Sequence, residues 1–386
     1  MSAEGPLSVR THKEWLVSVN NTKQRHVYET VRRRIEAGDF QPGDRIPSDS
    51  ELVREFGVSR PTVAKALREL ERAGMVRRKT GSGTYVLDVA GAEGQQFGLL
   101  IPGLGETEIF EPICASMARV AQLMGHGLVW GANATHAPSF EKGRQAIALC
   151  ERYLQDGVGG IFFAPLEHVD DKDQVNARII SLCESADVPV VLLDRDLVPY
   201  PERSDHDLVG IDNRRVGYAV THHLFQQGCE RVMFFARPGS AATIDARIAG
   251  FMEAVVKDAG SFDAKLVQRC DPKDREAIGA FFASQRPDGI VCGNDVTAGH
   301  LMHTLDQMGL DVPDDVLVAG IDDVKYAELL RVPLTTVRQP CEALGEAAFR
   351  TMIDRIDVPN APARDVLLGC ELIERESTKR IKETAR

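Results

Sequence analysis

The chain has 386 residues, of which 43% are hydrophobic, and its formal net charge is −11. This length predicts two or three domains, and the composition excludes a disordered or fibrous protein. The eight cysteines are scattered singly without a CxxC pair, which argues against a metal ribbon or a disulfide framework and fits a reducing compartment.

The amino-terminal stretch "MSAEGPLSVRTHKEWLVSV" lacks the apolar run of a signal peptide, and no later segment reaches membrane-spanning length. We therefore expect a cytoplasmic protein with no membrane partner. Residues 1–90 hold 16 Lys and Arg against 12 Asp and Glu, whereas the rest of the chain holds 30 against 45. Because binding to phosphates depends on the charges beside them, the basic part can bind nucleic acid although the whole chain is acidic.

The first ninety residues predict three helices followed by a strand pair. Residues 24–37 carry apolar side chains at four-residue spacing, which is typical of an amphipathic helix. Ser48 is a natural N-cap for a second helix that runs to about Phe56, and Ser59 can cap a third that runs to about Ala73. The stretch "MVRRKTGSGTYVL" then indicates two short strands around a glycine turn.

Two short helices joined by "GVS" and followed by a basic strand pair predict a winged helix-turn-helix. The second helix should present its amino-terminal end to base edges in the major groove, and Arg60 can donate two hydrogen bonds to a guanine. The wing would place basic side chains along the backbone of the duplex, and its glycines let the tip approach DNA closely. An ordinary charged surface helix followed by a hairpin is the alternative interpretation.

The segment "RIPSDSELVREFGVSRPTVAKALRELERAGMVRRKTGSGTYV" closely resembles the winged helix of the GntR family. The resemblance implies that Arg60 and Thr62 contact DNA and that Gly81 lies in a minor-groove wing. Ser50 and Ala64 stand where the family usually has arginine, so the operator is expected to differ. Lys65 and Arg45 are possible replacements for the missing arginines. The predicted DNA-binding residues are Arg45, Ser59, Arg60, Thr62, Lys65, Arg78, Lys79 and Gly81.

From Phe97 onward, nine apolar runs alternate with stretches of helical length, which predicts parallel sheets in two similar lobes. Polar residues follow several of these runs, as in Asp194-Arg195, Asn294 and Asp322. In open α/β sheets ligands bind beyond the carboxyl ends of the strands, and oxygens and amides there suit a hydroxyl-rich ligand. Arg247 offers paired donors. Helix capping by Asn294 and Asp322, and a surface salt bridge of Arg247, are the alternatives.

The segments "GIDNRRVGYAVTHHLFQQGCERVMFF", "DARIAGF" and "GNDVTAGHLMHTLDQMGLDVPDDVLVAGIDD" resemble the LacI/GalR effector domain, which is related to periplasmic sugar-binding proteins. The resemblance implies lobes of about 97–211 and 213–336, with crossover strands near residues 211, 338 and 363. Pro272 stands where relatives often have an aromatic ligand platform. By position, the implied effector-binding residues are Phe110, Asp194, Arg247, Asn294 and Asp322.

The sequence thus predicts an α/β protein with a winged helix-turn-helix over residues 1–87, a linker over 88–96, and a two-lobed, periplasmic-binding-protein-like effector and dimerisation domain with parallel sheets over 97–376. Its expected function is that of a repressor controlled by a sugar or sugar derivative, acting as a homodimer on a pseudo-palindromic operator. A sensor of a non-sugar polar metabolite such as a nucleobase, or an α/β enzyme, remains as an alternative.

The sequence contains none of the motifs GxxxxGK[ST], GxSxG or HExxH, so we expect no enzyme. We expect no cofactor either. His300 and His303 have the spacing of a metal pair on a helix but no third ligand nearby, and the adjacent His222 and His223 are expected to be structural.

Overall fold

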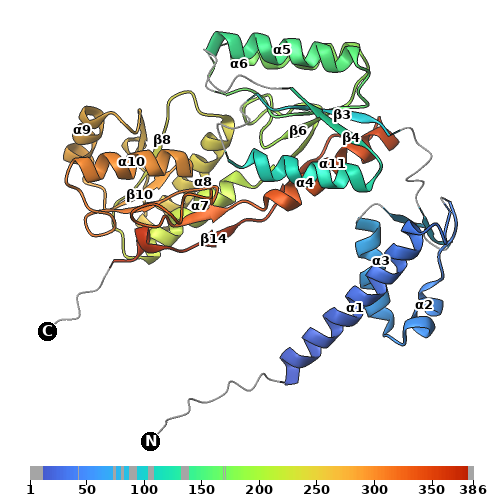
Figure 1. Cartoon of the computed structure of the whole chain (residues 1–386). Coiled ribbons are helices and arrows are strands. Elements are labelled where there is room, and N and C mark those ends of the chain that lie inside the picture. Colours follow the sequence, from blue (N-terminus) through green and yellow to red (C-terminus); the bar gives the residue numbers. More distant parts are fainter. Residues whose placement is uncertain are drawn as a thin grey trace, which may run out of the picture. The chain divides into compact units, whose positions relative to one another are not determined.

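The computed structural model describes residues 12–41, 43–72, 75–79, 82–86, 94–102, 108–131, 139–167, 169 and 171–380. The chain divides into two compact units, the first made of residues 1–95 with Arg119–Gly127 and the second of the rest of the chain (Figure 1). We refer to residues 12–86 as the head and to residues 96–380, which include all of α4 and β4, as the body.

The head contains three helices and a two-stranded antiparallel sheet around its own apolar core. Side chains from all three helices, among them Val27, Leu52, Val63 and Leu70, are fully buried. The first helix begins at His12, well before the predicted residue 24, since no glycine or proline interrupts "HKEWLVSVNNTK". The elements are α1 (His12–Glu36), α2 (Asp49–Phe56), α3 (Arg60–Arg72), β1 (Val76–Lys79) and β2 (Gly83–Val86).

The two short helices of the head begin where their capping residues predicted. The Ser48 backbone N–H donates to Glu51 Oε2 at 2.7 Å and the Glu51 backbone N–H donates to Ser48 Oγ at 3.4 Å, which is a capping box. Gly57, with φ of 60°, ends α2 in the left-handed conformation. At the start of α3, the Thr62 backbone N–H donates to the Ser59 carbonyl at 3.0 Å.

The first lobe of the body is a six-stranded sheet in the order β13-β7-β6-β5-β3-β4, and its paired strands β3–β5–β6–β7–β13 run parallel. Helices α5 and α6 cover one face through the core that includes Cys150, Cys183 and Phe163, and α11 covers the other through Phe349 (Figure 1). The elements are β3 (Gln96–Leu100), α4 (Phe110–Leu123), β4 (Gly127–Trp130), α5 (Ser139–Gln155), β5 (Ile161–Phe163), α6 (Lys172–Ser185), β6 (Val190–Leu193), β7 (Asp207–Ile211), α11 (Cys341–Asp357) and β13 (Asp365–Leu368).

The second lobe is a four-stranded parallel sheet in the order β11-β10-β8-β9. All nine apolar runs predicted as strands are strands in the body. The elements of this lobe are α7 (Asn213–Gln226), β8 (Val232–Ala236), α8 (Ala242–Ala259), η1 (Ala264–Leu266), β9 (Val267–Arg269), α9 (Arg275–Gln285), β10 (Gly289–Cys292), α10 (Asp295–Gln307), β11 (Leu317–Ala319), β12 (Thr336–Arg338), β14 (Glu371–Ile373) and η2 (Glu376–Thr378).

The chain passes between the lobes three times, close to the expected positions. It leaves the first lobe after β7, returns after β12, and leaves again after β13 to form β14, which pairs antiparallel with β12. Residues 341–368 therefore belong to the first lobe although they come late in the sequence. This threefold connection allows two lobes to move against each other while both remain covalently anchored.

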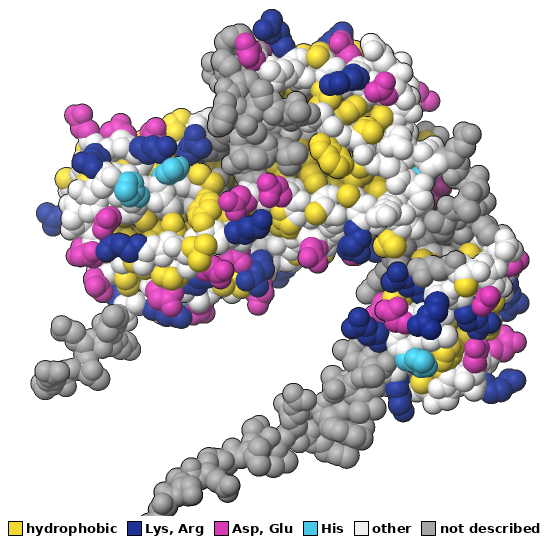
Figure 2. Space-filling model, in the orientation of Figure 1, with side chains coloured by type: hydrophobic (Ala, Val, Ile, Leu, Met, Phe, Trp, Pro, Cys, Tyr) yellow, Lys and Arg dark blue, Asp and Glu magenta, His cyan; other side chains and the backbone are white. Residues whose placement is uncertain are grey.

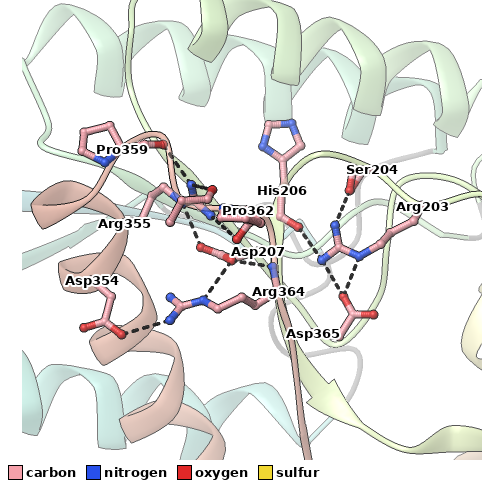
Figure 3. Close-up of polar contacts among 11 residues, drawn as sticks. Arg203, Ser204, His206, Asp207, Asp354, Arg355, Pro359, Pro362, Arg364 and Asp365 are labelled. Carbon is pink, nitrogen blue, oxygen red and sulfur yellow. Dashed lines mark hydrogen bonds and ion pairs between the residues drawn. The ribbon is translucent and has the colours of Figure 1, made fainter.

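A buried ion cluster lies at the amino ends of β7 and β13, the two first-lobe strands after which the chain crosses to the second lobe (Figure 3). Asp207, which begins β7 and is fully buried, accepts hydrogen bonds from Arg355 Nε of α11 at 2.9 Å and from the Arg364 backbone N–H at 2.8 Å. Arg203 and Asp365 form a second pair at 2.8 Å beside it. Burial raises the pKa of Asp207, but the two arginines outweigh burial and lower the pKa below its usual value.

Candidate nucleic-acid interface and effector cleft

The amino-terminal part of α3 presents three of the eight predicted DNA contacts to solvent. Ser59, Arg60 and Lys65 are exposed. Thr62 is only 4% exposed, and its hydroxyl lies 2.8 Å from Ser59 Oγ. The exposed side chains at this end are thus a serine hydroxyl and two cations, which are groups suited to phosphate oxygens and to the acceptors of a guanine edge.

The basic residues of the wing differ in how they are held. The Arg78 side chain folds back to donate to Asp49 Oδ2 at 2.6 Å. Arg45 forms an isolated bridge with Tyr85, and its side chain crosses Gly83, where a Cβ atom would come within 2.5 Å of Arg45 Nε. Gly81 and the side chain of Lys79 lie outside the described part of the chain. On the visible face of the head, Lys and Arg side chains alternate with acidic ones (Figure 2).

In the body, a cleft lies between the carboxyl ends of the strands of the two lobes. All five predicted effector-binding residues line it, so residues separated by more than 200 positions in the sequence meet in one site. The cleft is narrow, and its non-atom space of about 440 Å³ includes solvent at its open mouth. The lining residues are Ile109, Phe110, Glu167, Asp194, Arg195, Arg237, Ser240, Thr243, Ile244, Arg247, Asn294 and Asp322.

On the first-lobe side, Arg195 is nearly buried between two carboxylates. Its Nη1 lies 2.8 Å from Glu167 Oε1 and 3.2 Å from Asp194 Oδ2, and its Nε donates to the Pro165 carbonyl at 2.8 Å. Burial lowers the pKa of Arg195, but Glu167 and Asp194 raise it above its ordinary value. Burial also raises the pKa of Asp194, against the opposing effect of Arg195 and Arg247. This wall of the cleft thus holds one guanidinium between two carboxylates.

Phe110 begins α4 and lies beneath this group. Its side chain is only 1% exposed, and the Arg195 guanidinium stands over its ring with Cζ 5.9 Å from the ring centroid. The arginine therefore occupies one face of the ring of this predicted effector-binding residue. Stacking of a ligand on Phe110 requires Arg195 to move aside or the ligand to meet the ring at its edge.

On the second-lobe side, Arg247 projects from α8 and is 4% exposed. Its Nε donates to Asn213 Oδ1 at 2.8 Å and its Nη1 to the Gly293 carbonyl at 2.6 Å, while its Nη2 lies 3.7 Å from Asp322 Oδ1. The alternative of a surface salt bridge is wrong because this guanidinium is buried. Two of its nitrogens are occupied, and the third faces Asp322 at more than hydrogen-bonding distance.

Asp322 is an incompletely compensated charge in the cleft. Its side chain is buried, and Gln339 Nε2 donates to its Oδ1 at 2.8 Å. Burial raises the pKa of Asp322 to about 7, and the opposing effect of Arg247 does not cancel the rise. No helix begins between Asp322 and β12, so the capping alternative for this residue is wrong. Since Gln339 lies between β12 and α11, Asp322 also connects the cleft to a crossover.

Asn294 has the capping role that was the alternative interpretation, and it lines the cleft as well. Its Oδ1 accepts from the Thr297 backbone N–H at 2.9 Å and from Thr297 Oγ1 at 2.7 Å. The side-chain oxygen is therefore occupied by α10, and the amide NH₂ is the group through which Asn294 can donate to a ligand.

Several cleft residues were not predicted from the sequence, namely Ile109, Glu167, Arg237, Ser240, Thr243 and Ile244. Arg237 follows β8 directly, so the rule that marked Asp194 and Asn294 would have found it. Glu167 stands four residues beyond the end of β5, and Thr243 lies in the first turn of α8, so neither falls at a strand end. Only the packing of the lobes shows that they face the cleft.

His222, His223 and His303, which stood out in the sequence, take part in ordinary side-chain contacts. His222 Nδ1 lies 2.7 Å from Asp258 Oδ2, and His223 Nε2 lies 3.0 Å from Thr378 Oγ1. His303 Nε2 lies 2.7 Å from Gln307 Nε2. Across the described ranges, no three histidine, cysteine or carboxylate side chains gather as a metal site.

Among the helices that the structure describes, none combines the length and the apolar character needed to cross a bilayer.

Two family models match the chain, one in the head and one in the body. Residues 23–86 match the model of the bacterial regulatory proteins of the gntR family. Residues 221–378 match that of the periplasmic-binding-protein-like domain. The head is thus a gntR-type DNA-binding domain, and the body carries a periplasmic-binding-protein-like domain.

The full-length relatives are transcriptional regulators. The chain is 28% identical over 360 residues to an arabinose metabolism transcriptional repressor of Geobacillus stearothermophilus, covering 90% of this chain and 95% of the relative. It is 27% identical over 340 residues to the HTH-type transcriptional regulator MalR of Streptomyces coelicolor, covering 85% and 96%. Among solved structures, a complex of the transcriptional regulator CelR with cellobiose matches with a TM-score of 0.61 at 22% identity, over 83% of this chain and 91% of that one, which shows a shared fold.

Proposed function

We propose that this chain, which joins a gntR-type winged helix to a periplasmic-binding-protein-like body, is a transcriptional repressor controlled by a sugar or sugar derivative. The observation that carries the proposal is the cleft, where donors and acceptors from both lobes converge in a protein that also has a DNA-binding head. The relatives named above are transcriptional regulators, and two of them are named for arabinose metabolism or described with cellobiose.

The chemistry of the cleft fits a ligand rich in hydroxyl groups. Each sugar hydroxyl both donates and accepts, so it pairs well with a guanidinium on one side and a carboxylate on the other. Arg247 and Asp322 offer this combination, because a hydroxyl beside the Nη2 and Oδ1 atoms can accept from the first and donate to the second. Arg195 and Asp194 offer a second such pair from the first lobe.

In the proposed mechanism a homodimer in the cytoplasm binds a pseudo-palindromic operator through two copies of α3, and Arg60 reads a base. Closure of the lobes on the effector changes the affinity for operator. A ligand can shift this equilibrium only through its differential affinity for the two states, so operator must change effector affinity by the same factor. The protein performs no catalysis in this scheme.

A thermal-shift screen over pentoses, hexoses, sugar phosphates, nucleosides and amino acids tests the ligand class. A stabilising sugar, confirmed by calorimetry, supports the proposal, and stabilisation by a nucleoside alone would replace the sugar with another polar metabolite. Turnover of the stabilising compound would overturn the regulator-only role.

Arg247→Ala then tests the site. We expect it to abolish sugar binding and to leave binding of the ligand-free protein to operator intact, because Arg247 is confined to the body. Arg269→Ala, which removes an exposed arginine paired with Asp245 on the same lobe, is the matched control. Unchanged sugar affinity in Arg247→Ala would remove this residue from the site.

A further inference from the structure

Hydrogen bonds join the two lobes, and in two of those between described residues a first-lobe carboxylate accepts from a second-lobe backbone N–H. Glu167 Oε2 accepts from the Ala241 N–H at 3.1 Å. Glu108 Oε2 accepts from the Lys325 N–H at 3.1 Å. Because backbone donors cannot change rotamer, these bonds depend on the distance between the lobes rather than on the conformation of a second-lobe side chain.

The Glu167 carboxylate is held firmly by its own lobe. Its other oxygen accepts from Arg195 at 2.8 Å. The backbone just before it is held by the buried Asn176 of α6, whose Oδ1 accepts from the Leu166 N–H at 2.9 Å. The side chain is 20% exposed, so the bond to Ala241 is partly shielded from water. A charge-assisted hydrogen bond in such a position is stronger than one at an exposed surface.

Its partner, Ala241, is the N-cap residue of α8 and has no side chain that could cap the helix. Glu167 supplies a negative charge at this helix end from the other lobe, where the helix dipole favours an anion. The first two turns of α8 carry Thr243 and Arg247 into the cleft. The contact therefore fixes the helix that presents the second-lobe donors at the position where they face the first lobe.

We propose that Glu167 is a latch, a positioning residue that stabilises the closed arrangement of the lobes through the amino terminus of α8 and so sets how readily an effector closes the body. Its effect on effector affinity rests on the proposed function, whereas the contact itself does not. If closed lobes bind the effector more tightly than open lobes, a weaker latch lowers the apparent affinity for every effector in proportion to the lost closed population.

Two single variants and their combination test the latch from both sides. Glu167→Ala removes the acceptor. Ala241→Pro removes the donor and keeps the carboxylate, and the φ of −66° at Ala241 is the value that proline requires. Glu151→Ala, which truncates an exposed glutamate on α5 of the same lobe, is the control. Measurements are the melting temperature of the ligand-free protein and, by calorimetry, the affinity for the sugar found in the screen.

We expect each single variant to lower sugar affinity about tenfold, since a hydrogen bond to a charged group contributes at least the equivalent free energy. We also expect the double variant to be no worse than the more severe single variant, in melting temperature and in affinity, because both changes delete one contact. Additive effects in melting would overturn the contact. Non-additive effects on the melting temperature, combined with an unchanged sugar affinity, would overturn the role of the contact in closure. Should Glu167→Ala not fold, an unchanged affinity in Ala241→Pro alone would do the same.

Discussion

Two buried aspartates of the body show how differently the fold can treat the same charge. Asp207, at the amino ends of the first-lobe strands, is clamped by Arg355 and by Arg364, and its pKa is lowered. Asp322, at the cleft, has Arg247 only at 3.7 Å, and burial raises its pKa to about 7. Full compensation marks a structural charge, whereas incomplete compensation in a cleft leaves hydrogen-bonding capacity that a ligand can use.

The largest effect should come from breaking the compensated site. Asp207→Asn leaves Arg355, whose side chain is 13% exposed, facing a neutral amide, and removal of one partner from a buried ion pair costs about 3–5 kcal/mol. We expect the free energy of unfolding, measured from the body's transition in urea, to fall by that amount. Asp365→Asn, in the half-exposed pair beside it, is the control and should cost less than about 1 kcal/mol. Equal losses in the two variants would contradict the distinction.

The same substitution at the cleft should act in the opposite direction on stability. Asp322→Asn removes a buried carboxylate that is incompletely paired, so we expect the ligand-free protein to gain about 1 kcal/mol at pH 8, or about 2–4 °C in melting temperature. Sugar affinity should fall about 10- to 100-fold, because a charged acceptor is lost. A less stable variant with unchanged affinity, measured by melting and calorimetry, would show that Asp322 is a structural charge like Asp207.

The two sites should also differ in pH dependence. The pKa of Asp207 is lowered on folding, so its stabilisation is present above the unfolded value of about 4 and is lost as pH falls through the folded pKa. The pKa of Asp322 is raised on folding to about 7, so stability should decrease as pH rises from about 4 to about 7. Between pH 5 and pH 8, the melting temperature of Asp322→Asn should change less with pH than that of the unmodified chain. Asp365→Asn should show the same pH dependence as the unmodified chain.

The head offers a smaller version of the same contrast. Arg60 is exposed at the start of α3, whereas Arg78 is paired with Asp49. If Arg60 reads a base, Arg60→Ala should cost about 1–3 kcal/mol and relax the preference at one operator position. Arg78→Ala should cost less, since its ion pair must first be broken to release the side chain. Binding titrations on operator and random DNA separate the two, and equal loss on both DNAs would rule out base reading by Arg60.

Much of the candidate site followed from rules that act locally. Asp194, Asn294 and Asp322 were identified because each follows a buried strand, and parallel strands bring their carboxyl ends to the same edge of a sheet. The resemblance to the LacI/GalR effector domain added Phe110 to the predicted effector site and supported the inclusion of Arg247. The roles of these residues in binding remain predictions. No local rule pointed to Glu167, because its importance depends on a helix terminus that belongs to the other lobe and lies 74 positions later in the chain.

The sequence by itself determined the order of the elements and the starts of α2 and α3. Ser48 caps α2 and the nine apolar runs form strands, since capping and burial periodicity depend on neighbours along the chain. Tertiary structure alone decided how the charges are paired. It buries Asp207 with Arg355, leaves Asp322 undercompensated, and brings the sulfurs of Cys150 and Cys183, which are scattered in the sequence, within 3.7 Å. Pairing and desolvation depend on distances between segments remote in sequence, and these distances exist only in the folded chain.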